Sequence, residues 1–191
     1  MSPSPRRTSS KFNLILFIIV CVLAIALIVT LTKRRAGVEK APGPPGKPSE
    51  ELEVGTKSVL LYFGSSDGSE LVETTRDVMA SSEPSALLAT IIRELISGPS
   101  GKGISTLPSG TQLRSAYISD KTAYLDFSRE LKNDFQGGST EEYLTLASIV
   151  RTVSGNFPDI THVQILVEGS TVDSIGGHYD LTEPLSVYDW E

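Results

Sequence analysis

Apolar and polar positions in the first part of the folded region predict a strand pair followed by a helix. The run Val59–Phe63 is apolar on both faces, as in a central strand of a sheet. After a Gly- and Ser-rich loop, Leu71–Val78 is rich in Val and Thr and is its expected hairpin partner. Pro84 suits a first helical turn, and Gly98-Pro99 ends the helix. The apolar residues at helical spacing between them are Leu88, Ile91, Ile92 and Leu95.

A similar pattern follows in residues 113–167. Leu113–Ile118 and Ala123–Phe127 are expected to form two strands about a turn. Ser139 and Glu142 have the spacing of a capping box that opens a long amphipathic helix. Val163–Val167 then alternates as a last strand. The apolar positions of the helix are Tyr143, Ala147, Val150 and Phe157.

The element order is therefore β-β-α-β-β-α-β. Hairpins supply the strand pairs, and each helix has one apolar stripe. We therefore expect an α+β two-layer sandwich, with both helices on one face of an antiparallel or mixed sheet. The segment after Gly169 lacks a regular pattern and is expected to pack along the sheet edge.

An apolar stretch near the N-terminus predicts one transmembrane helix over residues 12–32. Its centre, Leu14–Leu31, contains no charge. As a helix it would be roughly 27 Å long, close to the ~30 Å hydrocarbon core of a bilayer. Three alternatives are a signal peptide cleaved at Ala24-Ile25-Ala26, a lipoprotein signal with Cys21 acylated, and a soluble core helix. We expect an uncleaved anchor, because the apolar run continues past Ala26 and Ile18, Ile19 and Val20 precede Cys21 instead of Gly or Ala.

The remaining boundaries follow from this anchor. Residues 1–11 are a short basic segment, 33–57 a Pro- and Gly-rich linker, and 58–191 the folded domain. Basic residues on the two sides of the apolar stretch are nearly balanced. We place the N-terminus in the cytoplasm and the domain outside, because large domains translocate largely regardless of charge.

The net charge of the chain changes sign near the start of the folded domain. The 191 residues carry a net charge of −6; residues 1–55 hold 8 basic and 4 acidic residues, a net +4, whereas residues 56–191 hold 9 and 19, a net −10. An acidic domain repels nucleic acids and anionic lipid headgroups, so neither is an expected partner of its surface. The single Cys excludes an internal disulfide scaffold.

The region from about Val59 to Val187 resembles the GerMN domain of sporulation and spore germination proteins. The matching segments are VLLYF, ELISGP, LPSGT at Leu107–Thr111, AYLDFS at Ala123–Ser128, EEYLTLASIVRTVSGNFP, VQILVEG and GGHYD. The resemblance implies an extracytoplasmic, envelope-attached, non-enzymatic module related in fold to ring-building modules of secretion and sporulation complexes. Some members carry two such domains and a lipid-modified Cys, whereas for this chain we expect one domain and an ordinary transmembrane helix.

One motif in the domain points to hydrolase chemistry. Gly64–Gly68 matches G-x-S-x-G, with Ser66 at the nucleophile position and His178 as a conceivable base. A nucleophile elbow leads directly into a helix, but Leu71–Val78 has a strand pattern. We therefore expect Ser66 in a hairpin loop without a catalytic role. Gly98–Gly103 only faintly resembles a phosphate-binding loop, because its spacing is wrong and it follows a helix.

Metal ligands are scarce in this sequence. The chain has two His, and its one Cys lies in the apolar segment. His178 and Asp180 could face one way, with Asp126 or Asp173 as a third ligand, but we expect a turn in which the imidazole makes a local hydrogen bond. His162 is expected to be an edge residue at the start of a strand.

Asp126 lies between two apolar residues of a strand. Alternation places it on the solvent face, and on the helix-covered face it would need backbone amides or Arg114 as partners.

These observations lead to an expected role without catalytic, cofactor-binding or metal-binding residues. We expect a single-pass, envelope-facing GerMN-domain protein that acts by protein–protein assembly with envelope proteins, as a homo- or hetero-oligomer. A module that binds glycans or a small envelope ligand is the first alternative. A serine hydrolase that uses Ser66 with His178 is the second.

Overall fold

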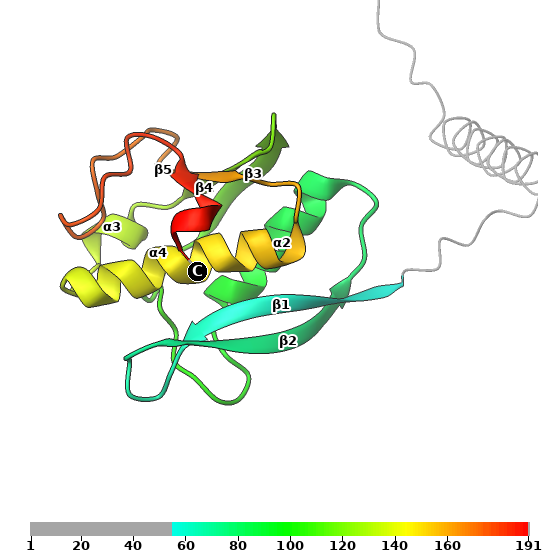
Figure 1. Cartoon of the computed structure of the whole chain (residues 1–191), viewed down its shortest axis with the longest axis horizontal. Helices are drawn as coiled ribbons and strands as arrows, with labels where there is room; N and C mark the ends of the chain where they lie inside the picture. Colours follow the sequence, from blue (N-terminus) through cyan, green and yellow to red (C-terminus); the bar gives the residue numbers. More distant parts are fainter. Residues whose placement is uncertain (1–54, 191) are drawn as a thin grey trace, which may run out of the picture. The chain divides into compact units, whose positions relative to one another are not determined.

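The computed structural model of the protein describes residues 55–190. The expected segments 1–11 and 12–32, and nearly all of 33–57, lie outside these residues. No helix within the described range combines the length and apolar character needed to span a membrane. The elements are β1 (Thr56–Gly64), β2 (Leu71–Met79), α2 (Pro84–Ile96), β3 (Leu113–Ser119), β4 (Thr122–Phe127), α3 (Glu130–Asn133), α4 (Ser139–Asn156), β5 (His162–Val167), β6 (Leu185–Ser186) and the 3-10 turn η1 (Val187–Asp189), shown in Figure 1.

All seven elements expected from the sequence are present in the expected order, and the fold is α+β. Helix α2 begins at Pro84 and ends two residues before Gly98. Asp120 and Lys121 both have positive φ, which is the geometry of a tight two-residue hairpin between β3 and β4. The short elements α3 and β6 were not predicted.

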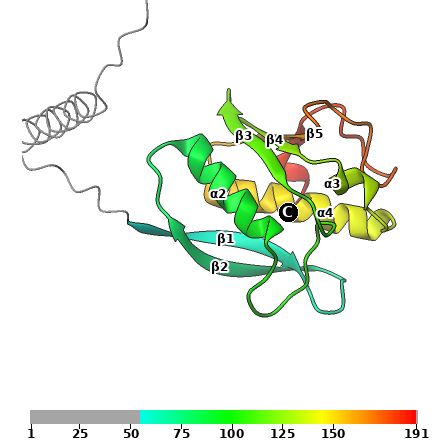
Figure 2. The same cartoon turned by 180° about the vertical axis from the view of Figure 1, so that it is seen from behind.

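The expectation of a single sheet is wrong. Strands β1 and β2 form a separate antiparallel pair, and the second sheet has the order β3-β4-β5-β6. This second sheet is mixed, because β4 and β5 are parallel and are joined through α4. Figures 1 and 2 show both long helices between the hairpin and the four-stranded sheet. The helices therefore do not cover one face of a common sheet.

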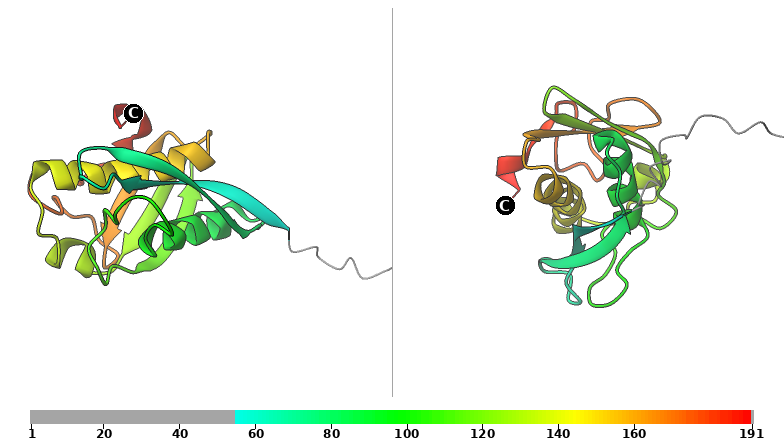
Figure 3. Two further views of the ribbon diagram at one scale, coloured as in Figure 1. Left: turned by 90° about the horizontal axis from the view of Figure 1, so that it is seen from below. Right: turned by 90° about the vertical axis from the view of Figure 1, so that its right-hand side faces the viewer.

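Strand β1 is apolar on alternate residues but is not central in a sheet. Its free edge lies beside α4, whose Asn156 and Thr152 side chains hydrogen-bond to the β1 backbone. Side chains thus take the place of a third strand. Figure 3 shows α4 running between the hairpin and the four-stranded sheet.

The hydrophobic core joins both sheets and both long helices. Its largest fully buried side chains include Phe63 of β1, Phe127 of β4, Leu88, Ile91, Ile92 and Leu95 of α2, and Leu146 and Ile149 of α4. The tail after Gly169 follows the sheet edge as expected, because β6 pairs with the first residues of β5.

The capping box at the start of α4 is displaced by one residue from its expected position. Gly138 is the N-cap, and its backbone N–H donates to the Glu141 carboxylate at 2.9 Å. Glu142 is therefore free for another role, although the spacing from Ser139 had assigned it to the cap.

Candidate functional site

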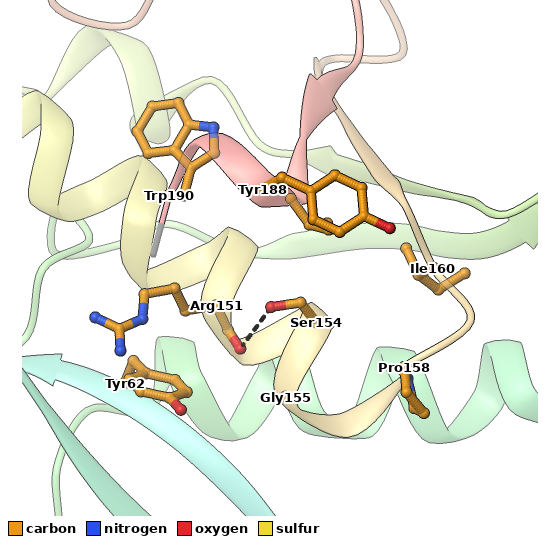
Figure 4. Close-up of a pocket in the computed structure, with 9 residues that line it drawn as sticks. Tyr62, Arg151, Ser154, Gly155, Pro158, Ile160, Tyr188 and Trp190 are labelled. Atoms are coloured by element: carbon orange, nitrogen blue, oxygen red, sulfur yellow. Dashed lines mark hydrogen bonds between the residues drawn. The ribbon is translucent and has the colours of Figure 1, made fainter.

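The candidate site is an open groove of about 490 Å³ over the C-terminal half of α4 (Figure 4). We call it the Arg151 groove. Helix α4 forms its floor, β1 forms one wall, and the C-terminal segment forms the other. Its lining residues are Tyr62, Arg151, Ser154, Gly155, Pro158, Ile160, Val187, Tyr188 and Trp190.

Arg151 is the only basic residue that lines the groove. Its guanidinium lies 4.6 Å from the centre of the Tyr62 ring, a cation–π arrangement that holds the charge in place. Within residues 55–190, no carboxylate lies at ion-pair distance from this guanidinium. Its charge is thus available to an anionic group that enters the groove.

Tyr62 connects the groove to strand β2. Its hydroxyl donates to the Glu73 carboxylate at 2.7 Å. Burial raises the pKa of the Tyr62 hydroxyl, and the hydrogen bond to Glu73 raises it further, while Arg151 opposes the change. Tyr62 therefore stays neutral at physiological pH and presents its ring to the guanidinium.

The C-terminal wall is aromatic. Trp190 is 5% exposed and stacks on Tyr143 of α4 with ring centres 5.4 Å apart, and it also contacts Tyr179 at 5.5 Å. Tyr188, two residues earlier, is 68% exposed. A fixed Trp190 beside an accessible Tyr188 gives the wall both rigidity and an exposed aromatic surface.

Sequence reasoning missed this groove. Tyr62 and Arg151 are far apart in the sequence, and no periodic pattern links a strand to a distant helix face. The one available signal was that Arg151 is the sole basic residue in Ser139–Asn156.

Ser66 lies in the turn between β1 and β2 and is exposed. The chain continues into strand β2, so the prediction of a hairpin loop is confirmed. The neighbouring Asp67 accepts hydrogen bonds from the hydroxyls of Ser65 and Ser69, which lower its pKa to about 2. The motif thus supplies turn-stabilising polar groups.

A serine-directed covalent probe is expected to leave Ser66 unmodified. An exposed turn hydroxyl without a general base in hydrogen-bond contact remains a weak nucleophile. Mass spectrometry of the probe-treated full-length protein measures the modification, with Ser66→Ala as the control. Stoichiometric labelling of Ser66 that disappears in that variant would support the hydrolase alternative.

His178 is held by a buried carboxylate. Its Nδ1 lies 2.9 Å from Oε2 of Glu142, which is 0% exposed. The same carboxylate accepts hydrogen bonds from the Ser174 hydroxyl and from the backbone N–H groups of Gly176 and His178. The expected local hydrogen bond of the imidazole is therefore replaced by a contact with α4.

The pKa of Glu142 reflects two opposing causes. Burial raises it, but the hydrogen bonds from Gly176, His178 and Ser174 together lower it below its ordinary value of 4.5. Gly176 is required for this approach, because a Cβ at that position would lie 2.8 Å from Glu142 Oε2 and 2.5 Å from a ring carbon of Phe135. Glu142 therefore anchors the segment 174–178 to α4.

Asp126 is 8% exposed, so its expected place in solvent is wrong. Alternation does put it on the face opposite Leu125, but the turn after β5 covers that face. Its Oδ1 accepts from the Gly169 N–H at 2.7 Å, and Arg114 lies 3.1 Å from Oδ2. The backbone amide and Arg114 that the sequence named as necessary partners are both present.

The remaining residues considered as metal ligands or as a general base do not form a common site. Asp180 accepts hydrogen bonds from the backbone and hydroxyl of Thr182 instead of facing His178. His162 begins β5, as expected, but this strand has neighbours on both sides and is not an edge. In the described part of the chain, no three His, Cys, Asp or Glu residues are grouped as metal ligands. Asp173 contributes its backbone carbonyl to Leu181.

The segment after α2, Gly98–Gly103, serves the fold. Arg76 of β2 donates to the Gly98 carbonyl and to the Ser100 hydroxyl, each at 2.8 Å. The segment Gly98–Gly103 follows helix α2, which agrees with the sequence argument against a phosphate-binding loop.

Comparisons with known proteins identify the family. The family model Germane, described as "Sporulation and spore germination", matches residues 60–173, more than half of the chain. A crystal structure of a candidate lipoprotein from Clostridium perfringens is 30% identical, with a TM-score of 0.52, over 72% of this chain and 91% of that one. No curated protein matches the sequence.

Two structures of the sporulation protein GerM from Bacillus subtilis are also similar. Its tandem GerMN domains are 26% identical with a TM-score of 0.53, over 77% of this chain and 49% of that one, so this chain spans about half of the tandem. Its first GerMN domain shares the fold, with 24% identity and a TM-score of 0.53 over 69% of this chain and 98% of that one. The resemblance found in the sequence is thus confirmed, and the chain belongs to the Germane family of sporulation and spore germination proteins.

Proposed function

We propose that this protein is a membrane-anchored, envelope-facing GerMN-domain protein that acts by non-catalytic protein–protein assembly in sporulation or spore germination. The family match supports the cellular process. The uncharged stretch Leu14–Leu31 and the similarity to a candidate lipoprotein support attachment to the membrane. The residues 1–54 that would carry the anchor lie outside the described structure.

The observation that carries the assembly role is the composition of the Arg151 groove. Arginine and exposed aromatic side chains are enriched at protein–protein interfaces, where they supply contact area and directional hydrogen bonds. Here Arg151, the half-buried Tyr62 and the exposed Tyr188 line one open groove, and the buried Trp190 supports its wall. A partner that places a carboxylate beside Arg151 and apolar groups against the aromatic wall fits this surface.

Site-specific photo-crosslinking in intact cells tests the proposal. A photoreactive amino acid at Tyr188 of the full-length protein is expected to form a discrete adduct with another envelope protein. The adduct should decrease at least tenfold when Arg151→Glu is added, because the reversed charge repels the partner's anion. Tyr117 is a matched control position, since it is 45% exposed and lies on β3. Equal adducts from both positions, or no effect of the reversal, would contradict the assembly role.

The volume of the groove favours one alternative, a module that binds a glycan or a small envelope ligand. Ligand pockets commonly have volumes of about 300–1,000 Å³, and the groove lies within that range. Retention of the full-length protein on purified cell-wall material, lost in Arg151→Glu, would favour this alternative over a protein partner.

A further inference from the structure

The two edges of the β1-β2 hairpin differ in their main-chain hydrogen bonding. On the β1 edge, every second residue from Leu60 to Gly64 has a partner from elsewhere in the chain. The Asn156 side chain accepts from the Leu60 N–H and donates to the Leu60 carbonyl, at 3.0 and 2.7 Å. The β1 residues and their partners are Leu60 with Asn156, Tyr62 with Thr152, and Gly64 with Ile104.

This arrangement fixes the direction of the polar groups on β2. In an antiparallel pair, residues directly opposite either bond to each other or both point their N–H and C=O groups away. Leu60 is opposite Thr75, and Tyr62 is opposite Glu73. Because Leu60 and Tyr62 bond to α4, the backbone groups of Thr75 and Glu73 point away from β1. Alternation places those of Asp77 in the same direction.

The outward backbone groups of Glu73, Thr75 and Asp77 have no hydrogen-bond partner within residues 55–190. All three side chains are also exposed. Strand β2 therefore offers one long unpaired edge of a two-stranded sheet. Such an edge is a template for addition of another strand.

We propose that the β2 edge binds an extended segment of another protein that carries Lys or Arg at two positions four residues apart. This inference rests on the proposed role in protein–protein assembly and names the chemistry of a partner. The backbone of the segment would pair with β2, and its basic side chains would lie beside the acidic side chains of β2.

The acidic side chains on β2 favour a partner strand with basic side chains. Glu73, Thr75 and Asp77 share one face of β2, and the backbone positions of Glu73 and Asp77 are roughly 13 Å apart at about 3.3 Å per residue. The one basic residue of β2, Arg76, lies on the other face and is bound to Glu94 at 2.7 Å. A partner strand with basic residues at the same spacing matches both carboxylates, of which that of Glu73 also accepts the Tyr62 hydroxyl at 2.7 Å.

A second copy of this chain fits the edge less well. Antiparallel pairing of two β2 strands centred on Thr75 would place Glu73 opposite Asp77 of the other copy. Like charges in directly opposite positions destabilise a strand pair. Residues 56–191 also carry a net charge of −10, from 9 basic and 19 acidic residues, so two copies repel each other.

Binding of designed peptides to the full-length protein in detergent micelles tests the inference. The probe is a blocked, fluorescent nine-residue peptide of alternating Ser and Val with Lys at positions 3 and 7. The control peptide has Glu at those positions. Fluorescence anisotropy is expected to show at least tenfold tighter binding of the Lys peptide, and the charge reversal Glu73→Lys with Asp77→Lys should invert this preference.

Variants of Thr75 separate edge pairing from simple charge attraction. Thr75→Pro removes an outward N–H without removing a hydrogen bond to β1, which makes proline tolerable at this edge position. We expect at least a tenfold loss of affinity for the Lys peptide, whereas Thr75→Val, which keeps the N–H, should bind as the wild type does. If Thr75→Pro does not fold, N-methylation of alternate backbone nitrogens in the peptide makes the same test on the wild-type protein.

Three results of the binding experiments would overturn the inference. They are equal binding of the Lys and Glu peptides, absence of binding, and binding that neither Thr75→Pro nor peptide N-methylation weakens. Sedimentation that shows a wild-type dimer and a Thr75→Pro monomer would also overturn it, since the edge would then pair with a second copy. If the Arg151-dependent adduct at Tyr188 persists in any of these cases, the proposed assembly role stands and only the β2 partner is wrong.

Discussion

Glu142→Ala is expected to destabilise the protein by about 2–4 kcal/mol, at about 1–3 kcal/mol for each partly buried donor left without an acceptor. Without the carboxylate, the N–H groups of Gly176 and His178 lose their acceptor, and a cavity forms beside α4. Urea unfolding of the full-length protein, followed by the fluorescence of Trp190, measures the loss.

The adjacent Glu141 is the matched control. It is exposed and accepts one hydrogen bond from the Gly138 N–H at the start of α4. Glu141→Ala should cost about 0.5–2 kcal/mol, as for the loss of a helix cap. Equal effects of the two substitutions would contradict the anchoring role of Glu142.

The effect of Glu142 should also depend on pH. Its folded-state pKa is lowered from 4.5, so the folded protein binds the proton more weakly than the unfolded chain does. The stability it contributes is fully present above pH 4.5 and is lost as the pH falls through the folded-state pKa. The difference in unfolding free energy between the wild type and Glu142→Gln should shrink from pH 7 to pH 3. A constant difference would show that the ionised carboxylate is not the stabilising form.

The sequence predicted individual elements well because each depends on a local period. Strands β1 and β4 and helix α2 have apolar residues at the spacings that place them on one buried side. How strands group into sheets is a different question, since a period within a strand does not identify its neighbour. In the part of the chain that the structure describes, no further strand pairs with β1, whose edge is bonded instead by side chains of α4, among them Asn156, 96 residues from Leu60.

The candidate site was less predictable than the individual helices and strands, because it also depends on contacts between residues that are distant in the sequence. Ser66 could be rejected from the strand pattern that follows it, which is local information. Glu142 was assigned to a cap because the helix was expected to start one residue late, and a helical shift of one residue rotates a side chain by about 100°. Tyr62 and Arg151 belong to different elements, so only the folded chain brings them together.

Asn156→Ala is expected to destabilise the protein by about 2–4 kcal/mol, because two partly buried backbone groups lose their partner at about 1–3 kcal/mol each. The Asn156 side chain accepts from the Leu60 N–H and donates to the carbonyls of Leu60 and Thr152. Thermal and urea unfolding measure the loss. Ser154→Ala, two residues earlier on α4, is the control and should change stability by less than about 0.5 kcal/mol.

Asn156→Ala should also change the self-association of the protein. Without the amide, the β1 edge presents free N–H and C=O groups at Leu60, in a strand whose side chains are more apolar than those of β2. Exposed apolar edges promote strand pairing between molecules. Asn156→Ala should therefore form oligomers at concentrations where Ser154→Ala does not, as measured by sedimentation velocity. A destabilised but monodisperse variant would show that other contacts of α4, such as that of Thr152 with Tyr62, are sufficient to protect the β1 edge.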